Sequence, residues 1–408
     1  MRRILSCITV AVLMVILCCS CGKLPPAKLI SDIYCDSNDT LVALGLHGRG
    51  FAPSSFAFFS EDRGATWQQA AFTPVPSNML LSLRPFPCGN VPALCAGGYT
   101  SVPEGSRWWC SKDGGRTWDE TQRKAPFVNP SGSYSIIPDV AVAGEMGTLV
   151  AAEAGPEGLY LLRSTDCGAQ WEQRLLLPDV RFASPIVSDG MGHLAFFGHA
   201  KDHLFGEQPK DWVYWSADAG ANWQEAVSPY GFFLQSMRLY RTPAGSLLAY
   251  NSQDRNYGQT VVFYSVDDGA SWKWSRGLDC FGRIISIAAD SRGRVVAMTR
   301  FGNILISDDG GGTWRDNGVP SYASADFNYD PTPMIFTDRG VVITAVDNSI
   351  IRSTDRGETW SIAALFTAPK ERISALCANG EGLVVAAAGM SFARSTDWGA
   401  TWQAGEMR

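Results

Sequence analysis

Residues 60–67 read SEDRGATW, an octapeptide that recurs along the chain in the form S-x-D-x-G-x-(T/S/N/Q)-W. The other seven copies are SKDGGRTW (111–118), STDCGAQW (164–171), SADAGANW (216–223), SVDDGASW (265–272), SDDGGGTW (307–314), STDRGETW (353–360) and STDWGATW (395–402). Successive copies begin 51, 53, 52, 49, 42, 46 and 42 residues apart. This spacing is the length of one four-stranded blade of a β-propeller.

The sequence around each octapeptide predicts the order of strands in a blade. Two apolar runs and one aromatic-rich run precede it, as in ISALCANGEGLVVAAAGMSFARSTDWGATW at residues 373–402. Short runs of this kind, bounded by Gly, Asp and Asn, are typical of half-buried strands. We therefore expect an all-β protein, an eight-bladed propeller with the octapeptide between the third and fourth strands, with seven blades as the alternative. Each blade is complete in sequence order, so ring closure should rest on packing between blades eight and one.

The residues of the octapeptide have a structural explanation. Its Gly can adopt a positive φ, and its Asp carboxylate can accept hydrogen bonds from backbone N–H groups of a turn. The Trp is large enough to fill the space between strands. We interpret the eight aspartates as structural residues, not catalytic acids: Asp62, Asp113, Asp166, Asp218, Asp267, Asp309, Asp355 and Asp397.

The octapeptides resemble the Asp boxes, or BNR repeats, of the sialidase-like propellers. The resemblance covers the whole chain after the N-terminal segment, and it implies that the octapeptide turns lie on the face away from a ligand site. The chain also resembles non-catalytic Asp-box propellers, such as photosystem assembly-factor-like proteins that bind other proteins, and sortilin-like relatives. Fold alone does not choose between these functions.

The N-terminus has the pattern of an export signal. Arg2 and Arg3 precede the apolar run 4–19, which is short for a membrane-spanning helix. The small residue before Cys21 and the prolines that follow resemble a bacterial lipoprotein signal, which implies lipidation at Cys21. We expect a signal peptide at 1–20, a linker at 21–29 and a single propeller at 30–408, anchored in a membrane and facing the periplasm or cell surface. An ordinary cleaved signal peptide and an uncleaved anchor are the alternatives.

Charge and cysteine spacing exclude several partners. The net charge is -6 and the pI is near 5.3, so we expect no nucleic-acid ligand. We expect no cofactor and no metal, because the cysteines match no zinc pattern and the histidines of blade four lack fixed ligand spacing. We place His193 in a strand and the other two, His199 and His203, in a loop. Three cysteines share one repeat position, so Cys35–Cys377 and Cys35–Cys88 are candidate disulfides.

Uneven loops point to a candidate ligand-binding face. The segments between the second and third strands are long in blades one to five and tight in blades six to eight. Extended loops on a rigid scaffold commonly carry binding sites. The candidate ligand-binding residues on this face are Arg49, Tyr99, Glu153, His199 and Arg300.

The resemblance to sialidases supplies an enzymatic alternative. That chemistry needs three arginines on a substrate carboxylate, an acid/base Asp, and a Tyr nucleophile helped by a Glu. The candidate catalytic residues are Arg238, Asp254, Arg255 and Tyr257 in blade five, Arg283 in blade six and Arg372 in blade eight. The sialidase Arg-Ile-Pro segment is absent from blade one. We therefore favour a binding or scaffold module for a protein or carbohydrate ligand, with a sialidase-like exo-glycosidase as the alternative.

Overall fold

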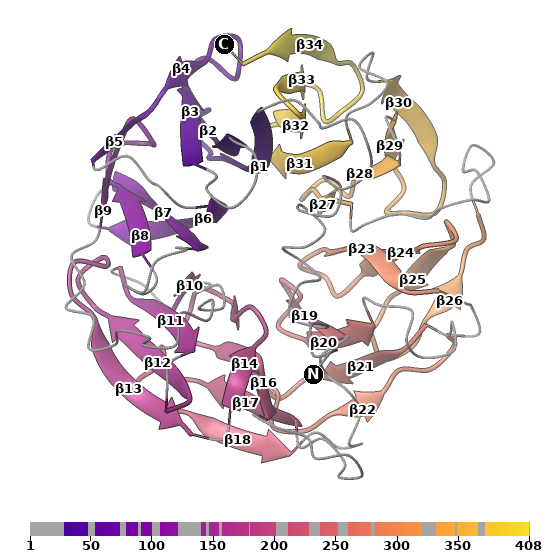
Figure 1. The fold of residues 1–408 in the computed structure, drawn as a ribbon. Coiled ribbons are helices and arrows are strands. Elements are labelled where there is room, and N and C mark those ends of the chain that lie inside the picture. Colours follow the sequence, from indigo (N-terminus) through magenta and orange to yellow (C-terminus); the bar gives the residue numbers. More distant parts are fainter. Residues whose placement is uncertain are drawn as a thin grey trace, which may run out of the picture.

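In the computed structural model, eight β-sheets are arranged as the blades of a ring (Figure 1). The structure describes residues 28–407, except 48–53, 74–78, 89–90, 100–106, 121–139, 144–146, 155–156, 179, 201–210, 228–236, 252–259, 279–281, 320–331, 347–348 and 366–371. These residues form strands and turns, and none of them is helical. The all-β, eight-bladed propeller is confirmed. The signal, Cys21 and residues 22–27 of the linker lie outside the described residues and stay predictions, whereas Lys28 and Leu29, which we placed in the linker, belong to the first strand, β1.

Each blade contains four antiparallel strands in sequence order. Blade one has β1 (Lys28–Cys35), β2 (Leu41–His47), β3 (Ser54–Ser60) and β4 (Gln68–Gln69); blade two has β6 (Met79–Cys88), β7 (Val91–Tyr99), β8 (Arg107–Ser111) and β9 (Thr117–Glu120); blade three has β10 (Val140–Val142), β11 (Leu149–Ala154), β12 (Leu159–Ser164) and β13 (Glu172–Leu177); blade four has β14 (Val180–Ala183), β16 (Leu194–Ala200), β17 (Asp211–Ser216) and β18 (Gln224–Val227).

The second half of the ring repeats the pattern. Blade five has β19 (Met237–Arg241), β20 (Leu247–Asn251), β21 (Val262–Ser265) and β22 (Lys273–Trp274); blade six has β23 (Ile284–Ala289), β24 (Val295–Thr299), β25 (Ile304–Ser307) and β26 (Arg315–Asp316); blade seven has β27 (Met334–Phe336), β28 (Val342–Val346), β29 (Ser349–Ser353) and β30 (Ser361–Leu365); blade eight has β31 (Ile373–Ala378), β32 (Val384–Ala388), β33 (Ser391–Ser395) and β34 (Gln403–Glu406). Two short strands are added to these sheets: β5 (Ala71–Thr73) pairs in parallel with β9 of blade two, and β15 (Val187–Ser188) pairs with β16 of its own blade, blade four.

The octapeptides form the predicted turns between the third and fourth strands. In blade one the Ser60 hydroxyl donates to Asp62 Oδ1 at 2.8 Å and accepts from the Gly64 N–H at 2.8 Å. The Thr66 N–H donates to Asp62 Oδ1 at 2.8 Å, and the Thr66 hydroxyl donates to Oδ2 at 2.6 Å. The Ser-to-Asp and Gly-to-Ser bonds recur in all eight turns. The Asp carboxylates thus accept hydrogen bonds within their own turns, which agrees with the structural role predicted for them.

The glycine of the octapeptide serves two purposes. All eight have positive φ, for example +89° at Gly115 and +103° at Gly311. An added Cβ at Gly115 would lie 2.4 Å from Val42 Cγ2, in the second strand of the preceding blade. At Gly311 it would lie 2.2 Å from Leu248 Cδ2, again in the preceding blade. The glycine therefore permits both the turn and the close approach of two blades.

The residue before this glycine also has positive φ in every copy, although most copies do not place a glycine there. Its main chain or side chain reaches the preceding blade. Three arginines donate from the third strand of one blade to the carbonyl oxygen of this fourth residue in the next blade: Arg163 to Ala219 at 2.9 Å, Arg352 to Trp398 at 2.8 Å, and Arg394 to Arg63 at 3.3 Å. The octapeptides thus connect blades as well as strands.

We expect the octapeptide aspartates to make stability depend on acidic pH. Burial acts to raise the pKa of Asp62, but hydrogen bonds from Thr66 and Ser60 outweigh it and lower the pKa from 3.8 to about 2. Because the folded-state pKa lies below the unfolded value, the stabilisation is present above pH ~4 and is lost as pH falls towards 2. Asp62→Ala should lower the free energy of unfolding by about 1–3 kcal/mol at neutral pH, since turn donors lose their acceptor.

Urea unfolding of both proteins at several pH values tests this. The difference between wild type and Asp62→Ala should shrink from pH 4 to pH 2, while ligand binding at neutral pH stays unchanged. A difference that is constant down to pH 2 would contradict the pKa argument.

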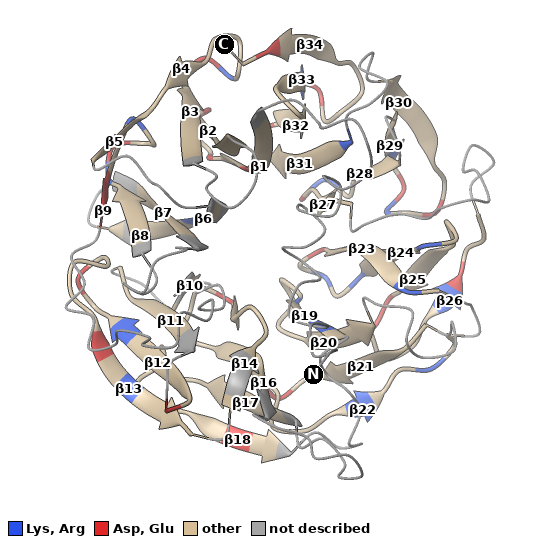
Figure 2. Ribbon diagram, in the orientation of Figure 1, with Lys and Arg blue, Asp and Glu red and all other residues tan. Residues whose placement is uncertain are grey.

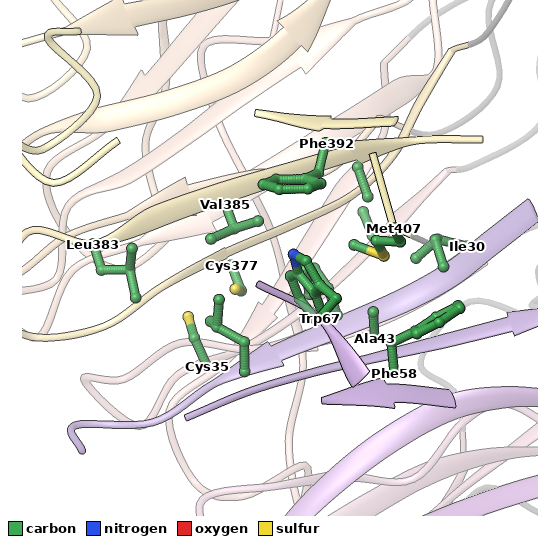
Figure 3. Close-up of a cluster of buried hydrophobic side chains, with 14 of the residues drawn as sticks. Ile30, Cys35, Ala43, Phe58, Trp67, Cys377, Leu383, Val385, Phe392 and Met407 are labelled. Carbon is green, nitrogen blue, oxygen red and sulfur yellow. The ribbon is translucent and has the colours of Figure 1, made fainter. Parts of the chain in front are cut away.

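The ring closes between blades eight and one without exchange of a strand, as predicted. The Ile30 N–H donates to Gly389 O at 3.0 Å, and the Ser374 hydroxyl donates to Ile30 O at 2.7 Å. Asn379 Nδ2 donates to Asp39 Oδ1 at 3.1 Å. One apolar cluster spans both blades (Figure 3), and its members include Ile30, Cys35, Ala43, Phe58, Trp67, Cys377, Leu383, Val385, Phe392 and Met407. Closure rests on this packing and these hydrogen bonds.

Two disulfides are present among the described residues, and neither was predicted. Cys88, the last residue of β6, is bonded to Cys167 in the octapeptide of blade three, and Cys95 is bonded to Cys110 within blade two. The predicted Cys35–Cys88 bond is therefore wrong. Cys35 and Cys377 are free thiols in the structure, so the alternative pairing is not formed either. The pairing of Cys167 was not predicted, because this residue occupies a variable position of the repeat.

Candidate functional site

The direction of the strands gives the ring two different faces. The octapeptides lie on one face, together with the turns that join each first strand to the second, and we call this the octapeptide face. The starts of the first strands and the ends of the second strands lie on the other, which we call the loop face. The first strand of each blade lies nearest the centre of the ring (Figure 1). A side chain at the start of a first strand is therefore placed where the loop face meets the centre.

The candidate ligand-binding residues lie at ends of second strands, on the loop face. Tyr99 is the last residue of β7, and Glu153 is the next to last of β11. His199 is the next to last residue of β16, opposite Asp211, so its predicted position in a loop is wrong. Arg300 directly follows β24. Arg49 lies outside the described residues, as do His203 and most of the long loops.

Three of the candidate catalytic arginines share this face. Arg238 is the second residue of β19 and is exposed, Arg283 directly precedes β23, and Arg372 directly precedes β31 and is exposed. They belong to blades five, six and eight. Asp254, Arg255 and Tyr257 lie outside the described residues. The topology thus brings three cationic side chains to one face, on separate blades.

Arg283 and Arg300 are held together in blade six. The Arg300 N–H donates to Arg283 O at 2.8 Å, which extends the pairing of β23 and β24 by one step towards the loop face. The Arg300 guanidinium lies 5.1 Å from the centre of the Phe301 ring, which is 40% exposed. The Thr260 hydroxyl of blade five donates to Gly282 O at 2.7 Å. Two arginines and an accessible aromatic ring therefore sit together beside blade five.

Arg238 contacts a tyrosine that the sequence analysis did not single out. It lies opposite Tyr250 in the register of β19 and β20, and its side chain forms a hydrogen bond with the Tyr250 phenol. Burial raises the pKa of Tyr250, and Arg238 opposes this rise. The phenol is therefore protonated at neutral pH. The apolar run of β20 could have identified Tyr250 as buried, but not its arginine neighbour.

On the octapeptide face, a second polar cluster lies where the turn between β15 and β16 of blade four meets blade five. His193 directly precedes β16, so its predicted position in a strand is wrong. Its Nδ1 lies 2.5 Å from Asp189 Oδ2, and Arg241 Nη2 lies 2.7 Å from Asp268 Oδ1. Burial acts to raise the pKa of Asp189, but hydrogen bonds from Met191 and His193 lower it. Within the described part of the chain, no group of three or more His, Cys, Asp or Glu is arranged to hold a metal ion. Acidic and basic segments are interspersed around the ring (Figure 2).

Comparison with known proteins shows similarity in fold and a distant sequence relative. No protein-family profile matches the chain. A xyloglucanase from Hypocrea jecorina (strain QM6a) is 23% identical over 346 residues, which cover 80% of this chain but only 31% of that enzyme. Saccharomyces cerevisiae Sqt1 has a similar structure, with a TM-score of 0.53 and 12% identity, covering 78% of this chain and 83% of Sqt1.

The structural likeness shows the fold alone. YCF48 from Cyanidioschyzon merolae, at a TM-score of 0.47 and 14% identity, covers 92% of this chain and 97% of its own. The chain spans about a third of the xyloglucanase that it matches. In the part of this chain that the structure covers, no helix meets the length and apolar character needed to cross a membrane.

Proposed function

We propose that this chain is an exported, membrane-anchored propeller that binds a glycan or protein ligand on its loop face. The observation that carries the proposal is the placement of Arg238, Arg283 and Arg372 at the starts of first strands in three blades. Guanidinium groups are planar, permanently charged donors that suit carboxylate, amide and sugar oxygens. The octapeptide face, by contrast, uses its carboxylates within its own turns.

Two further observations support parts of this proposal. The distant sequence match to a xyloglucanase favours a glycan among the ligand classes, because that relative's name refers to a polysaccharide. The disulfides Cys88–Cys167 and Cys95–Cys110 favour export, since such bonds persist mainly in oxidising compartments. Lipidation at Cys21 remains part of the proposal and is tested by mass spectrometry of the mature N-terminus.

A glycosidase is the second candidate. The same three arginines are the residue type that sialidase-like chemistry requires on a substrate carboxylate, and the octapeptides resemble Asp boxes. Hydrolysis also needs a nucleophile and an acid/base pair, and the candidates Tyr257 and Asp254 lie outside the described residues. Binding without turnover therefore requires fewer assumptions about the site.

A binding titration with matched variants tests the proposal. The protein is titrated with xyloglucan oligosaccharides, a sialylated oligosaccharide and an acidic peptide, while release of reducing sugar or sialic acid is followed in parallel. We expect binding of at least one probe without release of product. Arg372→Ala should weaken that binding roughly tenfold or more, because a charge-assisted hydrogen bond is lost.

The control is Lys112→Ala, which removes an exposed charge on the octapeptide face. It should leave affinity unchanged. Equal weakening by both variants, or unaltered binding in Arg372→Ala and Arg283→Ala together, would contradict a site on the loop face. Release of product would establish the glycosidase instead.

A further inference from the structure

The seam between the first and last blades holds two buried thiols. Cys35 is the last residue of β1, Cys377 is the next to last of β31, and these two strands lie side by side. Both side chains belong to the apolar cluster that closes the ring. Figure 3 shows their sulfur atoms turned towards each other between the two blades. Within the described residues, every other cysteine is in a disulfide.

The two thiols interact directly. Burial raises the pKa of the Cys377 thiol well above its ordinary value, and a hydrogen bond with Cys35 adds to the rise. Such a bond brings the two sulfur atoms close without a covalent link. Two neighbouring hydrogen bonds also link the blades: the Ile30 N–H donates to Gly389 O, directly after β32, and the Ser374 hydroxyl of β31 donates to Ile30 O.

We propose that Cys35 and Cys377 form a disulfide that joins the first blade to the last, and that the structure shows its reduced form. In the reaction, one thiolate attacks a small-molecule or protein disulfide, giving a mixed disulfide and releasing one thiol. The second thiolate then attacks the cysteine sulfur of the mixed disulfide and releases the other thiol. Two cysteine thiols are oxidised, and one external disulfide is reduced to two thiols.

The position of this bond determines its effect. Cys88–Cys167 already links blades two and three, whereas the seam that closes the ring is held only by non-covalent contacts. A bond at the seam would enclose almost the whole chain, and cross-links that enclose long segments restrict the unfolded state most strongly. Oxidation would therefore add a covalent bond to the contact between the first and last blades and restrict the unfolded chain strongly.

The burial of both thiols also predicts when the bond forms. A thiolate is the reacting species, and the raised pKa of Cys377 keeps its thiolate fraction small in the closed ring. Oxidation of the folded protein should therefore be slow and should proceed when the seam opens transiently. The same burial protects the bond, once formed, from reduction.

The experiment uses the full chain as purified, before and after incubation with oxidised glutathione. Free thiols are alkylated in denaturant, and proteolytic peptides are examined by mass spectrometry without reduction. We expect a peptide pair joined through Cys35 and Cys377 after oxidation, and a rise in melting temperature of roughly 5–10 °C. If both cysteines are alkylated after prolonged oxidation, while Cys88–Cys167 and Cys95–Cys110 are intact, the proposal is overturned.

Matched variants separate the bond from other effects of oxidation. Cys35→Ala and Cys377→Ala each remove one sulfur and should melt at the same temperature with and without oxidised glutathione. A rise in melting temperature that persists in both variants would assign the effect to another cysteine and reject the proposal. Peptide mapping of wild type decides the question even if either variant fails to fold.

Discussion

Trp118→Ala should destabilise the ring by about 3–5 kcal/mol, because it removes a large buried side chain and leaves a cavity in the apolar core. Trp118 is 0% exposed, stacks on Phe72 with ring centres 5.6 Å apart, and donates its indole N–H to Gly115 O at 2.9 Å. Its apolar cluster contains residues of blades one and two, including Val42 and Leu44. The substitution therefore weakens both a blade and its interface.

Thermal unfolding and urea unfolding of Trp118→Ala measure this effect. The control is Trp274→Ala in β22, where the side chain is 40% exposed and contacts Phe263 at a ring separation of 4.2 Å. It should cost only about 1 kcal/mol. Equal losses from the two substitutions would show that Trp118 does not hold the interface between blades.

Gly311→Ala should cost about 2–5 kcal/mol, from a strained backbone and from a steric clash. Gly311 has a φ of +103°, and the new Cβ would lie 2.2 Å from Leu248 Cδ2, a buried atom of the preceding blade. Left-handed backbone costs an L-residue about 1–2 kcal/mol, and overpacking adds about 1–3 kcal/mol.

Gly245→Ala separates these two causes. Gly245 has a φ of +98°, but no atom lies within 4 Å of its ideal Cβ position. It should therefore show the backbone cost alone, about 1–2 kcal/mol. Both variants are compared by urea unfolding. If Gly311→Ala is no worse than Gly245→Ala, the octapeptide glycine is needed for its φ and not for the packing of blades.

The fold was predictable because the octapeptide combines a rare set of residues at a fixed spacing. The roles of Asp62, Ser60 and Gly64 follow from local chemistry, and the structure confirms each of them. The role of the fourth residue was not predictable, since positions occupied by Arg63 or Cys167 carry no preference that a single sequence reveals. Their partners in neighbouring blades are distant in the sequence: Arg63 O accepts from Arg394, 331 residues away, and Cys167 is bonded to Cys88, 79 residues away.

The Trp residues of the octapeptides differ in burial, which the repeat pattern did not predict. Trp118 and Trp314 are buried as expected, whereas Trp171, Trp223 and others are only partly buried. Identical positions of the repeat therefore differ in exposure. The candidate site was predictable in part: strand ends place Arg238, Arg283 and Arg372 on one face, whereas most of the long loops lie outside the described residues.

Because every blade is built from consecutive strands, the order of blades in the ring is independent of where the chain begins. A circularly permuted protein, with the present ends joined by a short linker and new ends opened between blades five and six, retains each β-sheet unbroken. Such a protein should fold to the same ring. The natural seam would then become an ordinary internal joint, and its contribution to folding could be measured separately from that of the chain ends.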